Sequence, residues 1–268
     1  MNTITDTEFC RFQRFIYEAA GITLSPAKKA LVCGRLSKRL QAHELESFGA
    51  YFELLSSGRA DDEVQTAVDL LTTNETYFFR EPKHFEALRE LATRARGQAQ
   101  PFRVWSAASS SGEECYSIAM VLADCLDGSQ TTWDVVGSDI STRVLRRART
   151  GHYPMERARN IPPAYLKRYC LRGQGEQDGT LLVERRLRAK VNFAQVNLNT
   201  ELPRLGAFDV VFLRNVMIYF NGDTKRQVVA RVLSLLKPGG HFFIGHSESL
   251  NDITTAVDQL APSVYCKP

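Results

Sequence analysis

Long hydrophobic runs are missing from this sequence of 268 residues. No stretch of eighteen consecutive apolar residues occurs, and Asp6, Glu8, Arg11 and Arg14 interrupt the first 21 residues. A membrane-spanning helix needs about 20 predominantly apolar residues, and a signal peptide needs a continuous apolar centre. We therefore expect a cytoplasmic protein with no membrane-inserted segment.

Paired cysteine motifs are missing as well. The sequence has no C-x-x-C pair and no histidine at the spacing of a metal ligand, and its six cysteines stand apart: Cys10, Cys33, Cys115, Cys125, Cys170 and Cys266. Zinc cages and disulfide frameworks need clustered cysteines. We expect no metal site and no disulfide framework, and we expect most of these thiols to be buried.

Two common catalytic signatures are also absent. The sequence has no G-x-G-x-x-G loop, which would indicate a dinucleotide site. It has no Cys–His or Ser–His–Asp arrangement that calls for nucleophilic catalysis. We interpret His84 and His246 as hydrogen-bonded structural residues.

Excess charge of either sign is small. The net charge of +4 cannot identify a partner by itself, but Lys28, Arg35, Lys38 and Arg39 fall within one short segment, whereas residues 61–75 are acidic. A basic helix face of this kind is either an ordinary solvated surface or a docking surface for an acidic partner. The sequence alone leaves both interpretations open.

Two patterns of apolar residues divide the chain. Residues 1–72 have the spacing of amphipathic helices, the first capped by Asp6 or Thr7 and ending near Gly21. Residues 73–84 form a linker, and residues 85–268 alternate between strands and helices. Residues 152–192 interrupt this alternation with two candidate strands, 168–172 and 180–183. The pattern predicts an α/β fold with a doubly wound sheet, an N-terminal all-α domain and a small antiparallel β insert.

Chemically distinctive loops follow the predicted parallel strands. Ligands bind outside the carboxyl ends of such strands, so the loops after residues 105, 138, 194 and 213 should converge. The first loop, 106–112, has only small side chains and leads into Glu113 and Glu114, which disfavour a phosphate and suit a cationic ligand. Asp139 follows the second strand, where an acid either holds ribose hydroxyls or caps the next helix. In combination with the first loop, we favour the ribose.

Two further segments point to the same crevice. Residues 74–80 (NETYFFR) and 214–220 (RNVMIYF) mix amides, aromatic rings and cations in a way that suits neither an amphipathic helix nor a strand. The first segment lies between the helices and the sheet, and the second follows the strongly apolar strand 208–213. We expect both segments to contribute to one binding site.

These residues resemble the chemotaxis receptor methyltransferase family, CheR, over almost the full chain. Six motifs occur in the family's order: NETYFFR at 74–80, the run at 105–119, SDI at 138–140, the F-x-x-x-N-L pattern at 193–198, RNVMIYF at 214–220 and GHSE at 245–248. Cys115 stands where the family commonly has proline. The resemblance implies a class I, Rossmann-like fold that binds S-adenosylmethionine, and an O-methyltransferase that esterifies glutamates of chemoreceptors during sensory adaptation.

The resemblance also implies roles for individual residues. The residues expected to bind S-adenosylmethionine, and its product S-adenosylhomocysteine, are Asn74, Thr76, Arg80, Glu113, Glu114, Asp139, Asn197, Leu198, Arg214 and Asn215. Asp139 would hold the ribose, and Asn197 and Leu198 would flank the adenine. Arg80 and Tyr219 would lie closest to the incoming carboxylate.

The resemblance further implies partners. Lys28, Arg35, Lys38 and Arg39 would dock on the acidic helical bundle of a chemoreceptor. In some members of the family the insert grips a receptor tail peptide, and the sequence leaves open whether this insert does. We expect a monomer.

Three other functions compete with this interpretation. A nucleic-acid methyltransferase should have an N-P-P-Y-like motif or a catalytic Pro-Cys pair, and neither occurs; we expect no nucleic-acid partner. A small-molecule carboxyl methyltransferase would use the helical domain as a lid. A non-catalytic adaptor would bind the cofactor or its product and report it to a partner.

Overall fold

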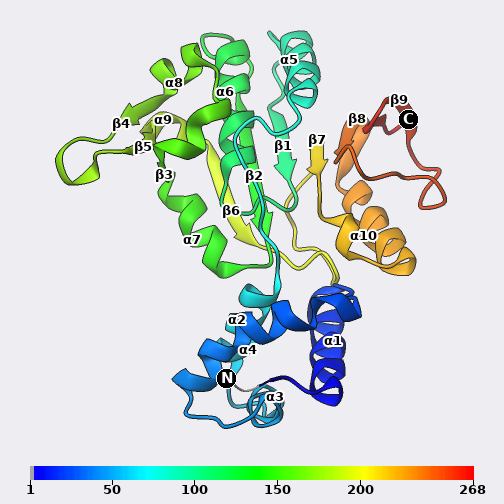
Figure 1. Ribbon diagram of the computed structural model, residues 1–268. Coiled ribbons are helices and arrows are strands. Elements are labelled where there is room, and N and C mark those ends of the chain that lie inside the picture. The colour runs from blue at the N-terminus through cyan, green and yellow to red at the C-terminus, as the bar shows by residue number, and fades with distance from the viewer. Residues whose placement is uncertain (1–2) are drawn as a thin grey trace.

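The computed structural model describes residues 3–268, so the first two residues of the expected N-terminal domain lie outside it. Four helices form one end of the molecule, and a sheet covered by helices forms the other (Figure 1). The expected α/β class and all-α N-terminal domain are confirmed. No helix within residues 3–268 is long and apolar enough to cross a membrane.

The N-terminal part contains α1 (Asp6–Ala20), α2 (Lys29–Ala42), α3 (Phe48–Ser56) and α4 (Asp61–Leu71), with a 3-10 turn, η1 (Pro26–Lys28), before α2. The expected cap of α1 was wrong by one or two residues. Thr5 is the N-cap, because its hydroxyl accepts from the Glu8 amide and the Glu8 carboxylate accepts from the Thr5 amide. Phe12 of α1 packs against Phe48 and Tyr51 of α3, which gives this part an aromatic core.

The second part is built on a sheet of seven strands in the order β6-β2-β1-β7-β8-β10-β9. Its strands are β1 (Phe102–Ser106), β2 (Trp133–Asp139), β6 (Val191–Gln195), β7 (Phe208–Leu213), β8 (Leu236–Ile244), β9 (Asp258–Ala261) and β10 (Val264–Cys266). The first five in spatial order pair in parallel, β10 pairs antiparallel with β8, and β9 pairs antiparallel with β10. The edge strand beside β10 is β9, which no sequence pattern indicated.

Helices cover both faces of this sheet. Alternate residues of β7 face opposite sides: Val210 and Phe212 share a core with α5 (Lys83–Ala95) and α6 (Glu113–Leu126), whereas Val211 and Leu213 share one with α10 (Gly222–Ser234). Along the chain, β2 and then β6 add to one side of β1, and β7 then pairs with the other side of β1. The order of strands therefore reverses between β1 and β7, where ligands bind in such sheets.

The insert is a separate sheet of three antiparallel strands, β3 (His152–Pro154), β5 (Thr180–Val183) and β4 (Cys170–Arg172), in the order β3-β5-β4. It also holds η2 (Met155–Asn160), α8 (Pro163–Tyr169) and η3 (Gly175–Gln177). The expected antiparallel insert is confirmed, but the sequence missed β3 and extended β4 into α8. Helix α9 (Arg185–Arg188) leads back to β6, which begins at Val191 within the expected insert range.

The cysteines are less buried than expected. Only Cys115 and Cys125 are buried, whereas Cys10 is exposed and the other three are half-buried. Burial raises the pKa of the Cys115 thiol. The prediction that most of the thiols are buried was therefore wrong.

A buried carboxylate on α4 joins the two parts. Asp69 accepts hydrogen bonds from the amides of Thr142 (3.0 Å) and Arg143 (3.0 Å) and from the Thr142 hydroxyl (2.9 Å). These amides begin α7 (Thr142–Thr150), whose own N-cap, Ser141, provides no side-chain hydrogen bond. Asp69 therefore caps a helix of the other part and fixes the helical end against the sheet.

Replacement of Asp69 by alanine should lower the free energy of unfolding by about 2 kcal/mol, because the α7 amides lose a charged acceptor. Urea titration measures this change. Asp62→Ala, an exposed position in the same helix, is the control and should cost less than about 1 kcal/mol. Equal losses in the two variants would contradict the capping role.

Candidate functional site

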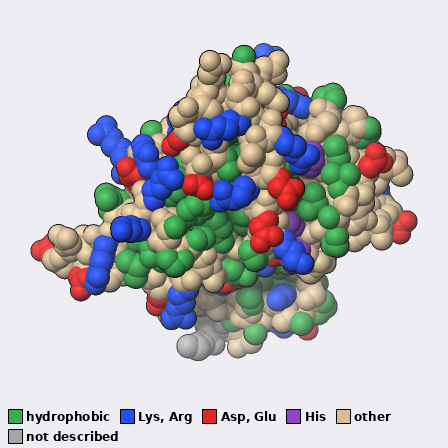
Figure 2. Space-filling view, turned by 90° about the horizontal axis from the view of Figure 1, so that it is seen from above, with side chains coloured by type: hydrophobic (Ala, Val, Ile, Leu, Met, Phe, Trp, Pro, Cys, Tyr) green, Lys and Arg blue, Asp and Glu red, His purple; other side chains and the backbone are tan. Residues whose placement is uncertain are grey.

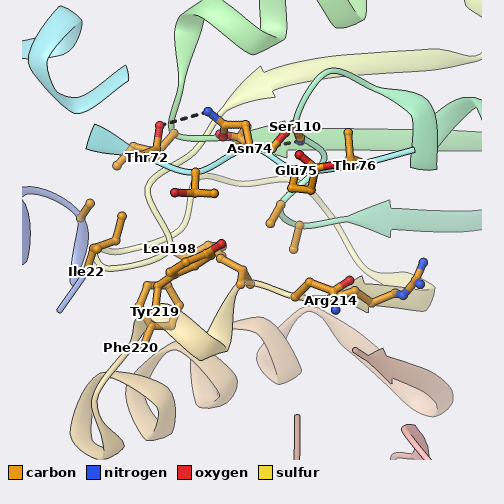
Figure 3. A pocket seen from close by; sticks show the side chains of 18 of the residues that line it. Ile22, Thr72, Asn74, Glu75, Thr76, Ser110, Leu198, Arg214, Tyr219 and Phe220 are labelled. Atoms are coloured by element: carbon orange, nitrogen blue, oxygen red, sulfur yellow. Dashed lines mark hydrogen bonds between the residues drawn. The ribbon is translucent and has the colours of Figure 1, made fainter. Parts of the chain in front are cut away.

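A cleft lies where the helical part meets the carboxyl ends of β1, β2, β6 and β7. The loops after all four strands line it, together with residues 72–76 and two residues of the helical part, Ala20 and Ile22. The cleft and its open mouth together enclose ≈ 840 Å³ of space that is free of protein atoms. Figure 3 shows Asn74, Glu75 and Thr76 on one side and Leu198, Tyr219 and Phe220 on the other. The cleft thus has one polar and one largely apolar wall.

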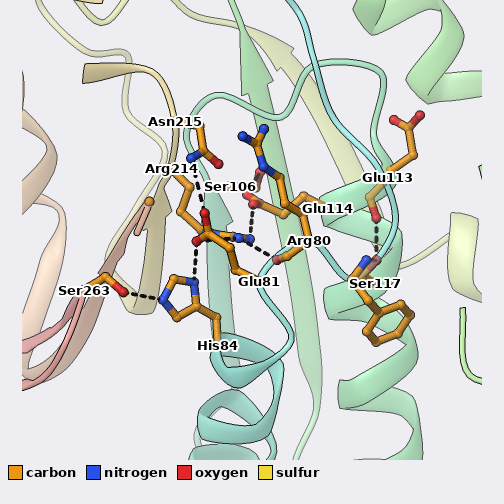
Figure 4. Close-up of polar contacts among 12 residues, drawn as sticks. Arg80, Glu81, His84, Ser106, Glu113, Glu114, Ser117, Arg214, Asn215 and Ser263 are labelled. Atoms are coloured by element: carbon orange, nitrogen blue, oxygen red, sulfur yellow. Dashed lines mark hydrogen bonds and ion pairs between the residues drawn. The ribbon is translucent and has the colours of Figure 1, made fainter. Parts of the chain in front are cut away.

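Most of the sequence-predicted site residues line this cleft. They are Asn74, Thr76, Arg80, Glu114, Asp139, Asn197, Leu198, Arg214, Asn215 and Tyr219. Glu113 does not. It is fully buried and faces the insert, where it accepts from the Ser111 hydroxyl (2.6 Å) and pairs with Arg157. Figure 4 shows Glu113 and Glu114 pointing away from each other, so Glu114 alone is available to a ligand in the cleft.

Asp139 ends β2 at the floor of the cleft. One of its carboxylate oxygens accepts from the Ser141 amide (2.9 Å) and the other from the Ser110 amide (2.9 Å), so it supports both the turn before α7 and the loop after β1. Burial raises its pKa to about 6, although these amide donors act in the opposite direction. The carboxylate retains further lone pairs for donors on a ligand.

Arg214 is almost completely buried at the end of β7, between two carboxylates. Its guanidinium lies 2.9 Å from Glu81 and 2.8 Å from Glu114, and it also donates to the Arg80 carbonyl oxygen (2.5 Å) (Figure 4). The Ser106 hydroxyl donates to the other oxygen of Glu114 (2.7 Å). Burial opposes ionisation of Glu81, but Arg214 and neighbouring hydrogen bonds lower its pKa overall. Two carboxylates around one guanidinium favour a cationic ligand beside them.

Glu81 is also part of a cluster with the geometry of a metal site. Its carboxylate and the ring nitrogens of His84 and His246 lie within 4.8 Å of one another. However, the Arg214 guanidinium already lies 2.9 Å from the Glu81 oxygen that faces His84, and a divalent cation there would be repelled. Burial lowers the pKa of His84 to about 3, and its Nε2 lies 2.8 Å from the Ser263 hydroxyl. The cluster is therefore best described as the surroundings of an internal ion pair.

Glu248, within the GHSE motif, shapes the turn that carries Asn215. It accepts from the amides of Asn215 (2.9 Å), Met217 (2.8 Å) and Gly245 (2.7 Å). Asn215 adopts a left-handed backbone conformation (φ 56°), which costs free energy for a residue other than glycine. A Cβ at Gly245 would lie 2.4 Å from the Asn215 side chain. The motif therefore forces this turn into the cleft.

Local contacts orient two other predicted residues, Arg80 and Asn197. Arg80 donates to the Glu75 carbonyl oxygen (3.0 Å) and lies over the Tyr77 ring, with 5.7 Å from its guanidinium carbon to the ring centroid. Asn197 donates to the Ala19 carbonyl oxygen (2.7 Å) and accepts from the Asn199 amide (2.9 Å). The Asn197 side chain therefore ties α1 to the loop after β6, and Leu198 beside it remains an apolar part of the wall.

The predicted basic face, formed by η1 and α2, is only partly accessible. Arg39 pairs with buried Glu63 (2.5 Å), and Arg35 donates to the carbonyl oxygens of Leu71 and Thr72 (3.1 Å each). Lys28 and Lys38 are exposed. Arg35 and Arg39 therefore stabilise the helical part, which leaves Lys28 and Lys38 as the accessible cations of this face.

Glu81, Glu248 and Arg157 have structural roles that were not predicted from the sequence. Glu81 lies one residue beyond the motif at 74–80, and Glu248 lies within the GHSE motif, which could have prompted a role. Arg157 had no sequence signal, because it is one of three charged residues in the short segment 155–160 of the insert, which forms η2.

Two family models match the chain. Residues 74–266 match the S-adenosylmethionine-binding domain of CheR methyltransferase, and residues 7–72 match its all-alpha domain. Similar curated proteins include the chemotaxis protein methyltransferase of Escherichia coli K12, which is 43% identical over 98% of this chain and 91% of that protein. Chemotaxis protein methyltransferase 2 of Pseudomonas aeruginosa is 42% identical over 97% of this chain and 93% of that protein.

Solved structures match more weakly. The glycopeptide N-methyltransferase MtfA in complex with S-adenosylmethionine has a TM-score of 0.35 and 19% identity, and the match covers 60% of this chain and 53% of that one. TrmN from Thermus thermophilus has a TM-score of 0.41 and 17% identity, with 69% and 48% covered. The full-length sequence matches and both family models establish that this chain belongs to the CheR methyltransferase family.

Proposed function

We propose that this chain is a cytoplasmic, monomeric enzyme that transfers the methyl group of S-adenosylmethionine to glutamate side chains of chemoreceptors and forms methyl esters. The observation that carries the proposal is the cleft at the switch point of the sheet, with buried Asp139 on its floor and two carboxylates around Arg214. The relatives are named chemotaxis protein methyltransferases, which supports a receptor as the substrate.

The residues of the cleft fit the cofactor. Asp139 offers its remaining lone pairs to ribose hydroxyls, Leu198 and Tyr219 offer apolar surface to an adenine, and Glu114 offers an anionic oxygen to an ammonium. When bound, S-adenosylmethionine supplies an electrophilic methyl group and positive charge. The carboxylates at Arg214 are matched to that charge, whereas they would repel a phosphate.

The acceptor needs orientation more than activation. A glutamate side chain has a pKa of about 4.3, so it is ionised at neutral pH and needs no general base. Arg80 and Tyr219 lie at the cleft with polar groups that can direct an incoming carboxylate. Alignment of two reactants with water excluded contributes roughly 7–11 kcal/mol in favourable cases, which is the main task proposed for this site.

Receptor binding is proposed for two surfaces. Lys28 and Lys38 on the helical part would contact an acidic helical bundle. The insert has a hollow whose lining includes the apolar residues Met155, Leu166 and Leu181 and the cations Lys167 and Arg172, which suits a receptor tail peptide. Figure 2 shows basic and apolar side chains side by side over this part of the surface.

Arg80→Ala should reduce kcat about 10- to 100-fold, because the acceptor carboxylate loses its orientation. The assay is release of base-labile methyl groups from a receptor fragment that has been incubated with labelled cofactor. Arg204→Ala, at an exposed position before β7, is the control and should match the wild-type chain. A small-molecule methyltransferase or a non-catalytic adaptor would give no labelled receptor at all.

Lowering the pH should weaken cofactor binding, because the Asp139 carboxylate becomes protonated. Its raised pKa of about 6 means that the carboxylate becomes protonated at a pH where an exposed aspartate stays ionised, and it then loses an acceptor for the ribose. The Kd of S-adenosylhomocysteine should be about tenfold higher at pH 5 than at pH 7.5, as measured by calorimetry. Asp139→Ala should bind more weakly at both values with little pH dependence, and a flat wild-type profile would refute the assignment.

Lys28→Glu combined with Lys38→Glu should raise the KM for the receptor fragment severalfold and leave the affinity for S-adenosylhomocysteine unchanged, because both lysines lie outside the cleft. The effect should shrink at high salt. Arg146→Glu with Arg147→Glu, two exposed positions on α7, makes the same change of charge elsewhere. If both pairs raise the KM equally, the basic face of η1 and α2 has no specific role.

A further inference from the structure

The insert reaches the back of the cleft through Arg157. This residue lies in η2, and its guanidinium donates to the carbonyl oxygen of Thr76 (2.8 Å). The same guanidinium pairs with Glu113, the first residue of α6, which is fully buried. One side chain of the insert therefore holds two segments of the main domain, the cleft-lining segment at Thr76 and the start of α6 at Glu113.

The segment that Arg157 holds has no regular backbone hydrogen bonds of a helix or sheet. Residues 73–77 are neither helical nor in a strand, so their position depends on single contacts. The Ser110 hydroxyl donates to the Asn74 carbonyl oxygen (3.0 Å), and the Phe79 amide donates to the Ser117 hydroxyl (3.0 Å). Between these two points, Arg80 donates to the Glu75 carbonyl oxygen (3.0 Å) from within the same part of the chain, whereas Arg157 holds Thr76 from the insert.

A second residue of the insert supports the neighbouring loop. The Tyr153 hydroxyl donates to the Ser111 carbonyl oxygen (2.7 Å), and the Tyr153 ring packs edge-on against Phe78 at 5.1 Å. Gly112 leaves room for this contact, because a Cβ there would lie 3.0 Å from the Tyr153 hydroxyl. The start of the insert is thus packed directly behind the loop that follows β1.

We propose that Arg157 is a positioning residue for the cofactor cleft. It fixes the Thr76 carbonyl and the first turn of α6 in one geometry, and so keeps Thr76 and Arg80 aimed into the cleft. The planar guanidinium can serve the carboxylate and the carbonyl at once, whereas a lysine presents a single point of charge. This inference rests on the proposed function, because it assigns Arg157 to the proposed cofactor site.

The experiment must separate positioning from simple charge neutralisation. Removal of Arg157 alone leaves the Glu113 carboxylate buried without a partner, which destabilises the fold whatever happens to the cleft. Arg157→Met combined with Glu113→Gln removes that unpaired charge but still leaves Thr76 without its donor. The temperature of unfolding therefore reports on Glu113, and the Kd of S-adenosylhomocysteine reports on the cleft.

We expect Arg157→Met to lower both the unfolding temperature and the affinity. The double variant should recover most of the unfolding temperature while its Kd stays about tenfold above the wild-type value. Arg157→Lys should fall between the wild-type chain and Arg157→Met in affinity. Glu113→Gln alone measures how the change from carboxylate to amide affects the unfolding temperature and the Kd. Arg159→Met, an exposed position in the same 3-10 helix, should behave as wild type.

Steady-state kinetics provide the second readout. The KM for S-adenosylmethionine should rise in the double variant, and the KM for the receptor fragment should stay unchanged. Recovery of both the Kd and the unfolding temperature in the double variant would overturn the proposal, as would a wild-type Kd in all variants. Absence of binding by the wild-type chain would instead refute the proposed function.

Discussion

The site depends on a buried guanidinium held between two carboxylates. Arg214 directly follows β7 and is paired with Glu81, which precedes α5, and with Glu114, the second residue of α6. A buried cation is tolerated only when it is paired and hydrogen-bonded, so these three segments must come together for the domain to fold. The same requirement places two carboxylates around this cation at the edge of the cleft. Stability and the preference for a cationic ligand therefore have one physical origin.

The helical part contributes residues to the cleft, and it also carries the exposed lysines Lys28 and Lys38. Asp69 caps α7 directly after the turn that Asp139 supports, and Asn197 ties the loop after β6 to α1. Ala20 and Ile22 close one side of the cleft. Contacts that join the two parts thus lie beside contacts that shape the site, so a change at the domain junction should be felt in the cleft.

The sequence predicted much of this arrangement because parallel strands impose it. Once strands end at residues 105, 138 and 213, the residues after them must meet, so Asp139 and Arg214 could be placed before the structure was known. The choice between Glu113 and Glu114 could not be made, because adjacent helical residues point about 100° apart and the direction depends on the start of α6. Arg35 and Arg39 look like surface residues in the sequence, and only tertiary contacts show that buried Glu63 and two carbonyl oxygens engage them.

We propose that this cleft binds a cationic nucleoside with its ribose on Asp139 and its amino-acid end beside Arg214. The decisive measurement is a crystal structure of the chain with S-adenosylhomocysteine. We expect ribose hydroxyls within hydrogen-bonding distance of the Asp139 carboxylate and the ligand's ammonium near Glu114. A ligand bound outside the cleft, or inside it with the ribose away from Asp139, would refute this assignment.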